Sequence, residues 1–182
     1  RYNVGYMPIK GEIKSMRLYE LNYEGYSDIS LDLGVKVKKI SLFAPFLQGE
    51  KKTAKTLVSR WVFYFLSRGD FRIYYVRAEG EDRPVIHTSY VMGPGVKFPF
   101  MEKGDIHIGP CNTAPDFRGR GIYRRVLKTI HAENYSRSKR AYMIVDESNL
   151  PSIKGIEAAG LTHIGTVERQ GIWKIYRRVS HV

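Results

Sequence analysis

A strand, a basic glycine-containing turn, a helix and a second strand follow one another between residues 105 and 145, and this order constrains the fold most. Residues 105–113 have strand character, and apolar residues recur at helical spacing after the turn at residues 118–121. Residues 141–145 are continuously apolar, as in a strand covered on both faces. Two parallel neighbouring strands need a crossover connection between them, and a helix usually provides it. We therefore expect an α+β (mixed αβ) fold with one locally parallel strand pair.

The rest of the chain predicts mainly antiparallel strands and two further helices. Proline near the start of residues 151–159, with Ser148 or Asn149 as the cap and Gly160 past the end, indicates a short helix. Turn signals separate the expected strands, and the last two strands form a hairpin across Gln170 and Gly171. The expected strands are two within residues 12–42, then 71–78, 85–92, 105–113, 141–145, 162–168 and 172–179.

A further amphipathic helix is expected between residue 54 and a stop at Gly69. Lys52, Lys55 and Ser59 lie opposite its apolar positions. The apolar positions that recur at helical spacing are Ala54, Leu57, Val58, Trp61, Val62 and Phe65.

Length and charge limit the classes of protein. A chain of 182 residues suits one domain, and no apolar run approaches the roughly 18 residues that span a bilayer. Cys111 is the only cysteine, which fits a reducing compartment, so we expect a cytoplasmic location. Thirty Lys and Arg against 18 Asp and Glu give a net charge of +12. This excess favours an anionic partner, either a nucleic acid, an anionic lipid surface or a phosphorylated cofactor.

The turn between Arg118 and Tyr123 has the properties of a phosphate site. Gly119 and Gly121 remove side chains that would block a close approach, and the following helix directs its positive end there. Eight Lys or Arg and one acid lie between residues 118 and 140. The basic side chains that follow on the helix, among them Arg124, equally suit a solvated face.

Residues 115–122 read PDFRGRGI and resemble the acetyl-CoA signature of the GNAT superfamily of N-acyltransferases, which is Arg or Gln, x, x, Gly, x, then Gly or Ala. Arg118 and Gly121 match its first two fixed positions, whereas Tyr123 stands where the family has a small residue. A strand followed by Asn149, a short helix and Gly160 matches a second family feature.

The resemblance implies a central mixed, mostly antiparallel sheet, with a parallel strand pair splayed around the CoA site and helices flanking it. Residues 1–182 would form one acyltransferase domain, with a variable part at 1–50 and a CoA-binding core at 105–161. Acetyl-CoA would be the co-substrate. The residues implied to bind it are Cys111, Asn112, Thr113, Arg118, Gly119, Arg120, Gly121, Ile122, Tyr123, Arg124, Asn149 and Ser152.

Acyl transfer to an amine needs a neutral nitrogen, yet an alkylamine has a pKa near 10.4, so a base assists at neutral pH. His107, 11 residues before Arg118, occupies a position where some family members carry a glutamate base, and Asp105 is the alternative. Each could equally be a structural strand residue. The family's tyrosine acid is replaced by Ile156, and Tyr142, Tyr123 or water could substitute for it.

The sequence favours an N-acetyltransferase that acylates a small primary amine, such as an amino sugar, by direct attack in a ternary complex. The alternatives are an acyl-CoA-binding GNAT-like protein without turnover and a basic nucleic-acid-binding domain. A nucleic-acid partner is disfavoured, and neither a membrane partner nor a metal is expected, because the five histidines lack ligand spacing. A Cys111 nucleophile is disfavoured for want of a His and acid partner. A homodimer is left open.

Overall fold

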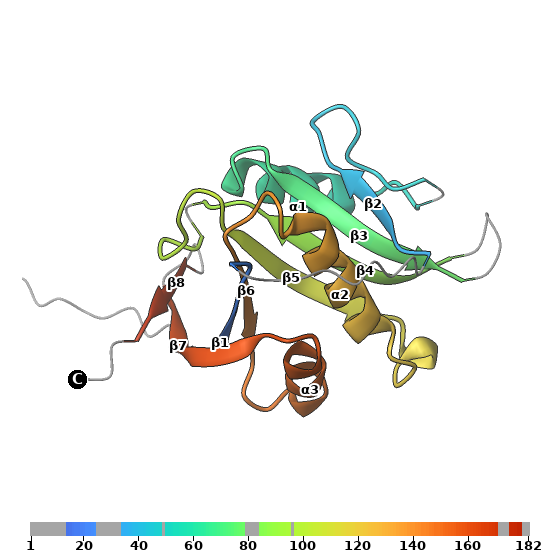
Figure 1. Ribbon diagram of the computed structural model, residues 1–182. Coiled ribbons are helices and arrows are strands. Elements are labelled where there is room, and N and C mark those ends of the chain that lie inside the picture. Colours follow the sequence, from blue (N-terminus) through green and yellow to red (C-terminus); the bar gives the residue numbers. More distant parts are fainter. Residues whose placement is uncertain are drawn as a thin grey trace, which may run out of the picture.

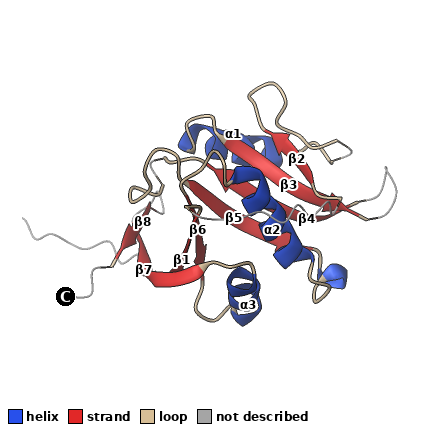
Figure 2. Cartoon of the chain, viewed as in Figure 1, coloured by secondary structure: helices blue, strands red, loops and turns tan. Residues whose placement is uncertain are grey.

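The computed structural model describes residues 14–24, 34–48, 50–78, 84–95, 97–170 and 175–179. Within these ranges the chain forms one eight-stranded sheet, three α-helices and a short 3-10 turn at Pro115–Phe117 (Figures 1 and 2). The strands follow the order β2-β3-β4-β5-β6-β1-β7-β8 across the sheet. The elements are β1 Lys14–Asn22, β2 Lys36–Lys39, α1 Ala54–Leu66, β3 Phe71–Arg77, β4 Val85–Met92, β5 Ile106–Thr113, α2 Ile122–Asn134, β6 Arg140–Val145, α3 Leu150–Ala158, β7 Thr162–Gln170 and β8 Ile175–Arg178.

The sheet is mixed and mostly antiparallel, as the sequence predicts. Strands β5 and β6, joined by the crossover helix α2, are the parallel neighbours. They pair over a short stretch, Ile106 with Ala141 and His107 with Tyr142. Beyond His107 the two strands diverge, while β5 keeps its antiparallel partner β4 as far as Thr113. The sheet is therefore splayed between β5 and β6, toward the N-terminal end of α2.

A bulge in β5 lies close to the point where the strands part. Ser89 of β4 faces Cys111, but Val91 faces Ile108, so one residue of β4 opposes two residues of β5 around Gly109. A bulge bends its strand and increases the local twist. This irregularity contributes to turning the second half of β5 away from β6.

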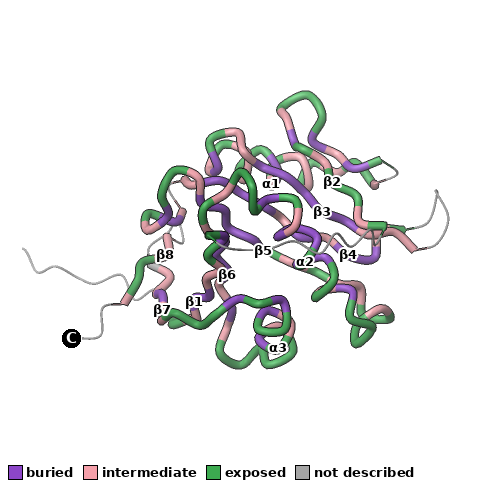
Figure 3. The backbone as a smooth tube through the Cα atoms, viewed as in Figure 1, coloured by how far each residue is buried: buried purple, intermediate pink, exposed green. Residues whose placement is uncertain are grey.

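Alternation along the strands divides the core between the two sheet faces. One face carries α2 and α3, whose Val126, Leu127 and Ile153 pack with apolar side chains of the central strands. The other face carries a second cluster that includes Phe71 and Ile73, and α1 lies behind the sheet on that side in the view of Figure 1. Figure 3 shows that buried residues are concentrated along these central strands.

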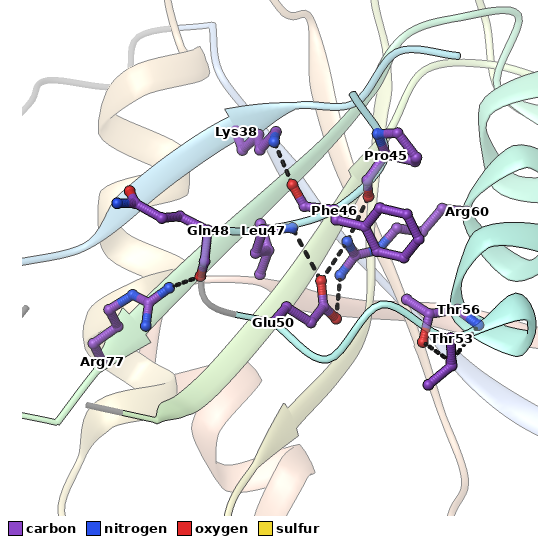
Figure 4. Close-up of polar contacts among 10 residues, drawn as sticks. All are labelled: Lys38, Pro45, Phe46, Leu47, Gln48, Glu50, Thr53, Thr56, Arg60 and Arg77. Atoms are coloured by element: carbon purple, nitrogen blue, oxygen red, sulfur yellow. Dashed lines mark hydrogen bonds and ion pairs between the residues drawn. The ribbon is translucent and has the colours of Figure 1, made fainter. Parts of the chain in front are cut away.

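Helix α1 confirms the expected element but not the burial that its apolar spacing suggests. Val58, Val62 and Phe65 are 57%, 48% and 63% exposed, whereas Arg60 is 2% exposed. The Arg60 guanidinium lies 2.7 Å from a Glu50 carboxylate oxygen and also donates to the Pro45 carbonyl (Figure 4). A buried guanidinium is tolerated when its charge is paired and its N–H groups are bonded. These contacts, with the packing of Phe63 and Tyr64 on the Phe71 cluster, hold this side of α1 against the protein and leave the other side facing outward.

The two strands expected within residues 12–42 are β1 and β2, which the sheet places far apart. Strand β1 lies between β6 and β7, and β2 is an edge strand beside β3. The final two strands pair antiparallel as expected, Val167 with Arg178 and Gln170 with Ile175. The turn proposed across Gln170 and Gly171 falls partly outside the described residues.

Candidate functional site

A cavity of about 560 Å³ opens where β5 has parted from β6. The second half of β5, the turn after it and the first turns of α2 and α3 form its wall. The lining residues are Cys111, Asn112, Thr113, Phe117, Arg118, Gly119, Gly121, Ile122, Tyr123, Arg124, Asn149, Pro151, Ser152 and Gly155. Of the twelve residues that the resemblance implies in CoA binding, the structure brings together all but Arg120.

The turn before α2 exposes main-chain N–H groups to this cavity. Gly121 is the N-cap of α2 and has φ 72° and ψ 4°, a left-handed conformation that favours glycine. Among the described residues no side chain caps this helix, and Ile122, Tyr123 and Arg124 line the cavity. The first N–H groups of a helix have no partner within the helix and carry its positive dipole end. The arrangement suits an anion with several oxygen acceptors.

Two arginines add positive charge at the cavity, and a third turns away. Arg118 and Arg124 line the wall, and Arg118 Nε donates to the Thr113 carbonyl over 3.0 Å, which joins the turn to the end of β5. Arg120 instead donates to the Asp116 carbonyl over 3.0 Å and lies over the Phe117 ring. Arg120 therefore stabilises the turn from outside, and its implied contact with CoA stays a prediction.

Tyr123 occupies the position at which the signature has a small residue. Its ring packs on α3 so tightly that a Cβ placed on Gly155 would lie 2.6 Å from Tyr123 Cδ1. The phenol bonds the Cys111 thiol, and burial raises its pKa well above the ordinary value. Tyr123 thus bridges α2, α3 and β5 at the inner end of the cavity.

Behind the cavity wall lies a polar network that the sequence did not reveal. The His87 ring bonds Thr113 through Nδ1 at 2.7 Å and Ser89 through Nε2 at 2.8 Å. Cys111 in turn interacts with Ser89 and Tyr123. Burial lowers the pKa of His87 to about 4 and raises the pKa of Cys111 to about 11, so both are neutral at pH 7. A thiol held in this form is a poor nucleophile.

Asn149 caps the start of α3 and also lines the cavity. Its Oδ1 accepts from the Ser152 N–H over 3.3 Å, and both residues line the wall. The cap that the sequence predicted is therefore present, while contact of Asn149 and Ser152 with a cofactor stays a prediction. Ile156, where the family's tyrosine acid would stand, is buried in the core.

The two predicted catalytic residues do not line the cavity. Asp105 is buried at the start of β5, where its oxygens lie 3.1 and 3.2 Å from Arg140 nitrogens and accept from the Glu102 N–H. A carboxylate bonded in this way is a structural anchor. Its pairing with Arg140 fixes the beginning of β5 to the beginning of β6, and this holds together the two strands that part further on.

His107 lies at the point of strand divergence. Its ring stacks on Phe98 at a centroid distance of 3.9 Å, and no described side chain bonds either ring nitrogen. The ring also approaches Gly109, where a Cβ would lie 3.3 Å from His107 Cε1. Burial lowers the pKa of His107 to about 3. Tyr142, a possible acid, faces the same side, where it contacts Phe100, and its pKa is raised by burial.

No cluster of three or more His, Cys, Asp or Glu side chains suited to a metal ion occurs within the described part of the chain. The described helices also include none whose length and apolar character would let it cross a bilayer.

Sequence comparison finds no matching family model and no matching curated protein. The fold, in contrast, is similar to solved structures. A Novosphingobium aromaticivorans protein described as a GNAT-family acetyltransferase has a TM-score of 0.53 at 15% identity, over 86% of this chain and 64% of its own. A GCN5-related N-acetyltransferase from Sphaerobacter thermophilus has a TM-score of 0.51 at 14% identity, over 85% and 50% of the two chains.

A tandem GNAT protein from the clavulanic acid biosynthesis pathway is also similar, with a TM-score of 0.52 at 14% identity over 84% of this chain and 51% of its own. This chain therefore spans between half and two thirds of the length of these three proteins. At such identities the similarity establishes a GNAT-like fold, as the sequence predicts.

Proposed function

We propose that this chain transfers an acetyl or short acyl group from acetyl-CoA to a primary amine on a small substrate, by direct attack in a ternary complex. One observation carries the proposal: the cavity joins the uncapped end of α2, the glycine turn and two arginines at the place where β5 leaves β6. A diphosphate is the anion that such a helix end accommodates.

The diverging strands provide the second part of the proposed CoA site. From Ile108 onward the side of β5 that faces β6 has no strand partner among the described residues, while the other side is bonded to β4. The amides of a pantetheine arm can pair with such an edge as a strand would. An N–H group between Cys111 and Thr113 would then bind the thioester carbonyl, and this bond would strengthen as the oxyanion forms.

His107 is kept as the proposed base on grounds of position. It lies at the divergence on the sheet face that carries the Phe71 cluster, whereas the cavity opens beside α2 and α3. An amine that arrives from the His107 side would meet the thioester between the strands. With a pKa of about 3, His107 is neutral at pH 7 but a weak base, and Phe98 covers its ring. We expect Phe98 to move aside and expose the ring before His107 takes up a proton.

The acceptor class is a small amine, with amino sugars as the first candidates. We place the reaction in the cytoplasm, in keeping with a single cysteine, and assign it to residues 1–182 as one domain. A GNAT-like protein that binds acyl-CoA without turnover remains the second candidate, because Tyr123 bridges the cavity and Ile156 replaces the tyrosine acid.

The test has two readouts on the whole chain. A thermal melt with acetyl-CoA reports binding, and release of free CoA thiol across a panel of amino sugars, polyamines and amino acids reports turnover. Both signals are expected. Binding without thiol release for any amine would favour the non-catalytic alternative, and stabilisation by oligonucleotides but not by acetyl-CoA would favour the nucleic-acid alternative.

A further inference from the structure

An exposed apolar surface lies on the side of the molecule that carries α1. Phe43 is 98% exposed and Phe65 is 63% exposed, values that are unusual for aromatic side chains in a folded domain. Trp61 Nε1 donates to the Leu42 carbonyl over 3.2 Å, so the loop before α1 lies against the helix. We call this surface the apolar α1 face, formed by Leu42, Phe43, Val58, Trp61, Val62 and Phe65.

The apolar α1 face is a fixed feature of the helix orientation. The opposite side of α1 is already committed, because Phe63 packs edge-on against Tyr90 and beside Phe71, and Arg60 is held by Glu50. Turning the apolar side inward would break the ion pair between Arg60 and Glu50 and remove Phe63 from its contacts with Tyr90 and Phe71. Contiguous exposed apolar surface of this kind marks a site of association.

Positive charge surrounds the apolar α1 face. Lys51, Lys52 and Lys55 are exposed at the start of α1, and Arg68 is exposed just beyond its end. Over the described part of residues 34–68 the sequence holds eight Lys or Arg and one acid, Glu50, which is paired with Arg60. The partner of this face should therefore be apolar at its centre and anionic around it.

We propose that the apolar α1 face docks on an anionic lipid surface, with Phe43 and Phe65 entering the headgroup boundary and the lysines meeting acidic headgroups. Aromatic and aliphatic side chains beside a lysine cluster are typical of helices that lie in a membrane interface. This departs from the sequence-based expectation of no membrane partner. It also does not depend on the proposed acyl transfer.

Two other occupants fit less well. A second copy of the chain would bring lysine clusters together across a shared face, and like charges in close contact oppose association. A single-stranded nucleic acid would stack on aromatic rings, but Leu42, Val58 and Val62, half of the residues of this face, offer no ring. A lipid surface matches the aliphatic and the aromatic side chains alike.

Docking through α1 leaves the cavity open. Helix α1 packs on the sheet face opposite α2 and α3, as Figure 2 shows, and the cavity lies beside those two helices. A membrane-bound molecule would therefore still admit a soluble cofactor.

The experiment is vesicle sedimentation of the whole chain with vesicles of phosphatidylcholine alone and of phosphatidylcholine mixed with phosphatidylserine. Binding is expected to the mixed vesicles and to fall steeply with salt. Replacing Lys51, Lys52 and Lys55 by Gln should weaken it about a hundredfold. Phe65→Ser should weaken it about tenfold or more, because it removes one inserted aromatic side chain.

Ile164→Ser is the matched control, since Ile164 is an exposed apolar residue on β7, outside the apolar α1 face, and its loss should not change binding. In a Trp173→Phe background Trp61 is the remaining tryptophan, and its emission should shift to the blue with the mixed vesicles only. Absence of sedimentation with the mixed vesicles, or wild-type binding by Phe65→Ser, would overturn the proposal. So would self-association or oligonucleotide binding that Phe65→Ser abolishes while vesicle binding is absent.

Discussion

Gly121→Glu should separate cofactor binding from folding. Gly121 has a left-handed backbone, and a Cβ added there would meet no described atom within 4 Å, so the new side chain would extend into open space at the cavity. Its carboxylate would accept from the free N–H groups of α2 and take the place proposed for the diphosphate. The loss of affinity follows from competition and from charge repulsion.

The magnitude can be estimated from Coulomb's law. Two unit charges about 5 Å apart repel by roughly 1–3 kcal/mol in the partly solvated range of effective dielectric constants. A diphosphate places two charges near the carboxylate, so a loss of about 2 kcal/mol, or about 30-fold in Kd, is a low estimate. The left-handed backbone costs a further 1 kcal/mol or so of folding stability with any side chain.

The assay is a thermal melt with acetyl-CoA at a concentration about 100 times the wild-type Kd. The wild type should gain about 2.7 kcal/mol, which is about 5–10 °C in Tm for a domain of this size. Gly121→Glu, at the same concentration, should gain about 0.9 kcal/mol, or about 2–3 °C.

Gly160→Glu is the matched control. Gly160 also has a positive φ, 100°, with no described atom near an added Cβ, but it does not line the cavity. Both variants should lose similar stability without ligand, and Gly160→Glu should keep the full acetyl-CoA shift. If the two variants responded equally to acetyl-CoA, the turn before α2 would not be the phosphate site.

Three further predictions concern the residues around the cavity. Gly155→Ala should cost about 1–3 kcal/mol of stability, because its methyl group overlaps the Tyr123 ring. In the Tyr123→Ala variant the same change should instead stabilise the protein by up to about 1 kcal/mol, because alanine is the better helix former. Urea unfolding of the four proteins tests this, and equal effects in both backgrounds would contradict it. His107→Gln should preserve acetyl-CoA binding and lower kcat, and an unchanged kcat would remove His107 as the base. Burial lowers the pKa values of three histidines, His87, His107 and His131, to about 4, 3 and 3. Below pH 6.5 the unfolded chain therefore binds protons that the folded protein does not. The contribution of these neutral rings to stability is complete above pH 6.5 and is lost as the pH falls toward their folded-state pKa values. Urea unfolding should therefore show a loss of about 4 kcal/mol in the free energy of unfolding between pH 7.5 and 5.5, and equal stability at the two pH values would show that burial does not lower these pKa values.

Local pattern predicted much of the fold and of the cavity wall. The order of strand, glycine turn, helix and strand between residues 105 and 145 implied the parallel pair, because parallel neighbours need a crossover connection and this helix provides one. Local pattern also predicted the turn at Gly121 and the cap at Asn149, since both depend on neighbours within a few residues. Those features are local, so they can be read from spacing and residue type.

The α1 helix shows the limit of prediction from local sequence pattern. Helical spacing placed Val58, Val62 and Phe65 on one side but could not say whether that side would face the sheet. Phe63 packs on the sheet, and Arg60 is bound to Glu50 and Pro45 in the preceding loop; no periodicity predicts these contacts. The side of a helix that faces the sheet is thus chosen by its contacts with distant elements, here aromatic packing together with a paired arginine, and not by its apolar spacing alone.

The sequence by itself determined the elements, the glycine turn before α2 and the excess of positive charge, because each is a property of adjacent residues or of composition. Only the tertiary structure decided that His87 and Ser89 reach Cys111 and Thr113, that Asp105 is bound to Arg140, and that His107 is covered by Phe98. These contacts depend on which strands are neighbours and in what register they pair. Register is set by the packing of the whole sheet, so pairs far apart in the chain are fixed only when the fold is complete.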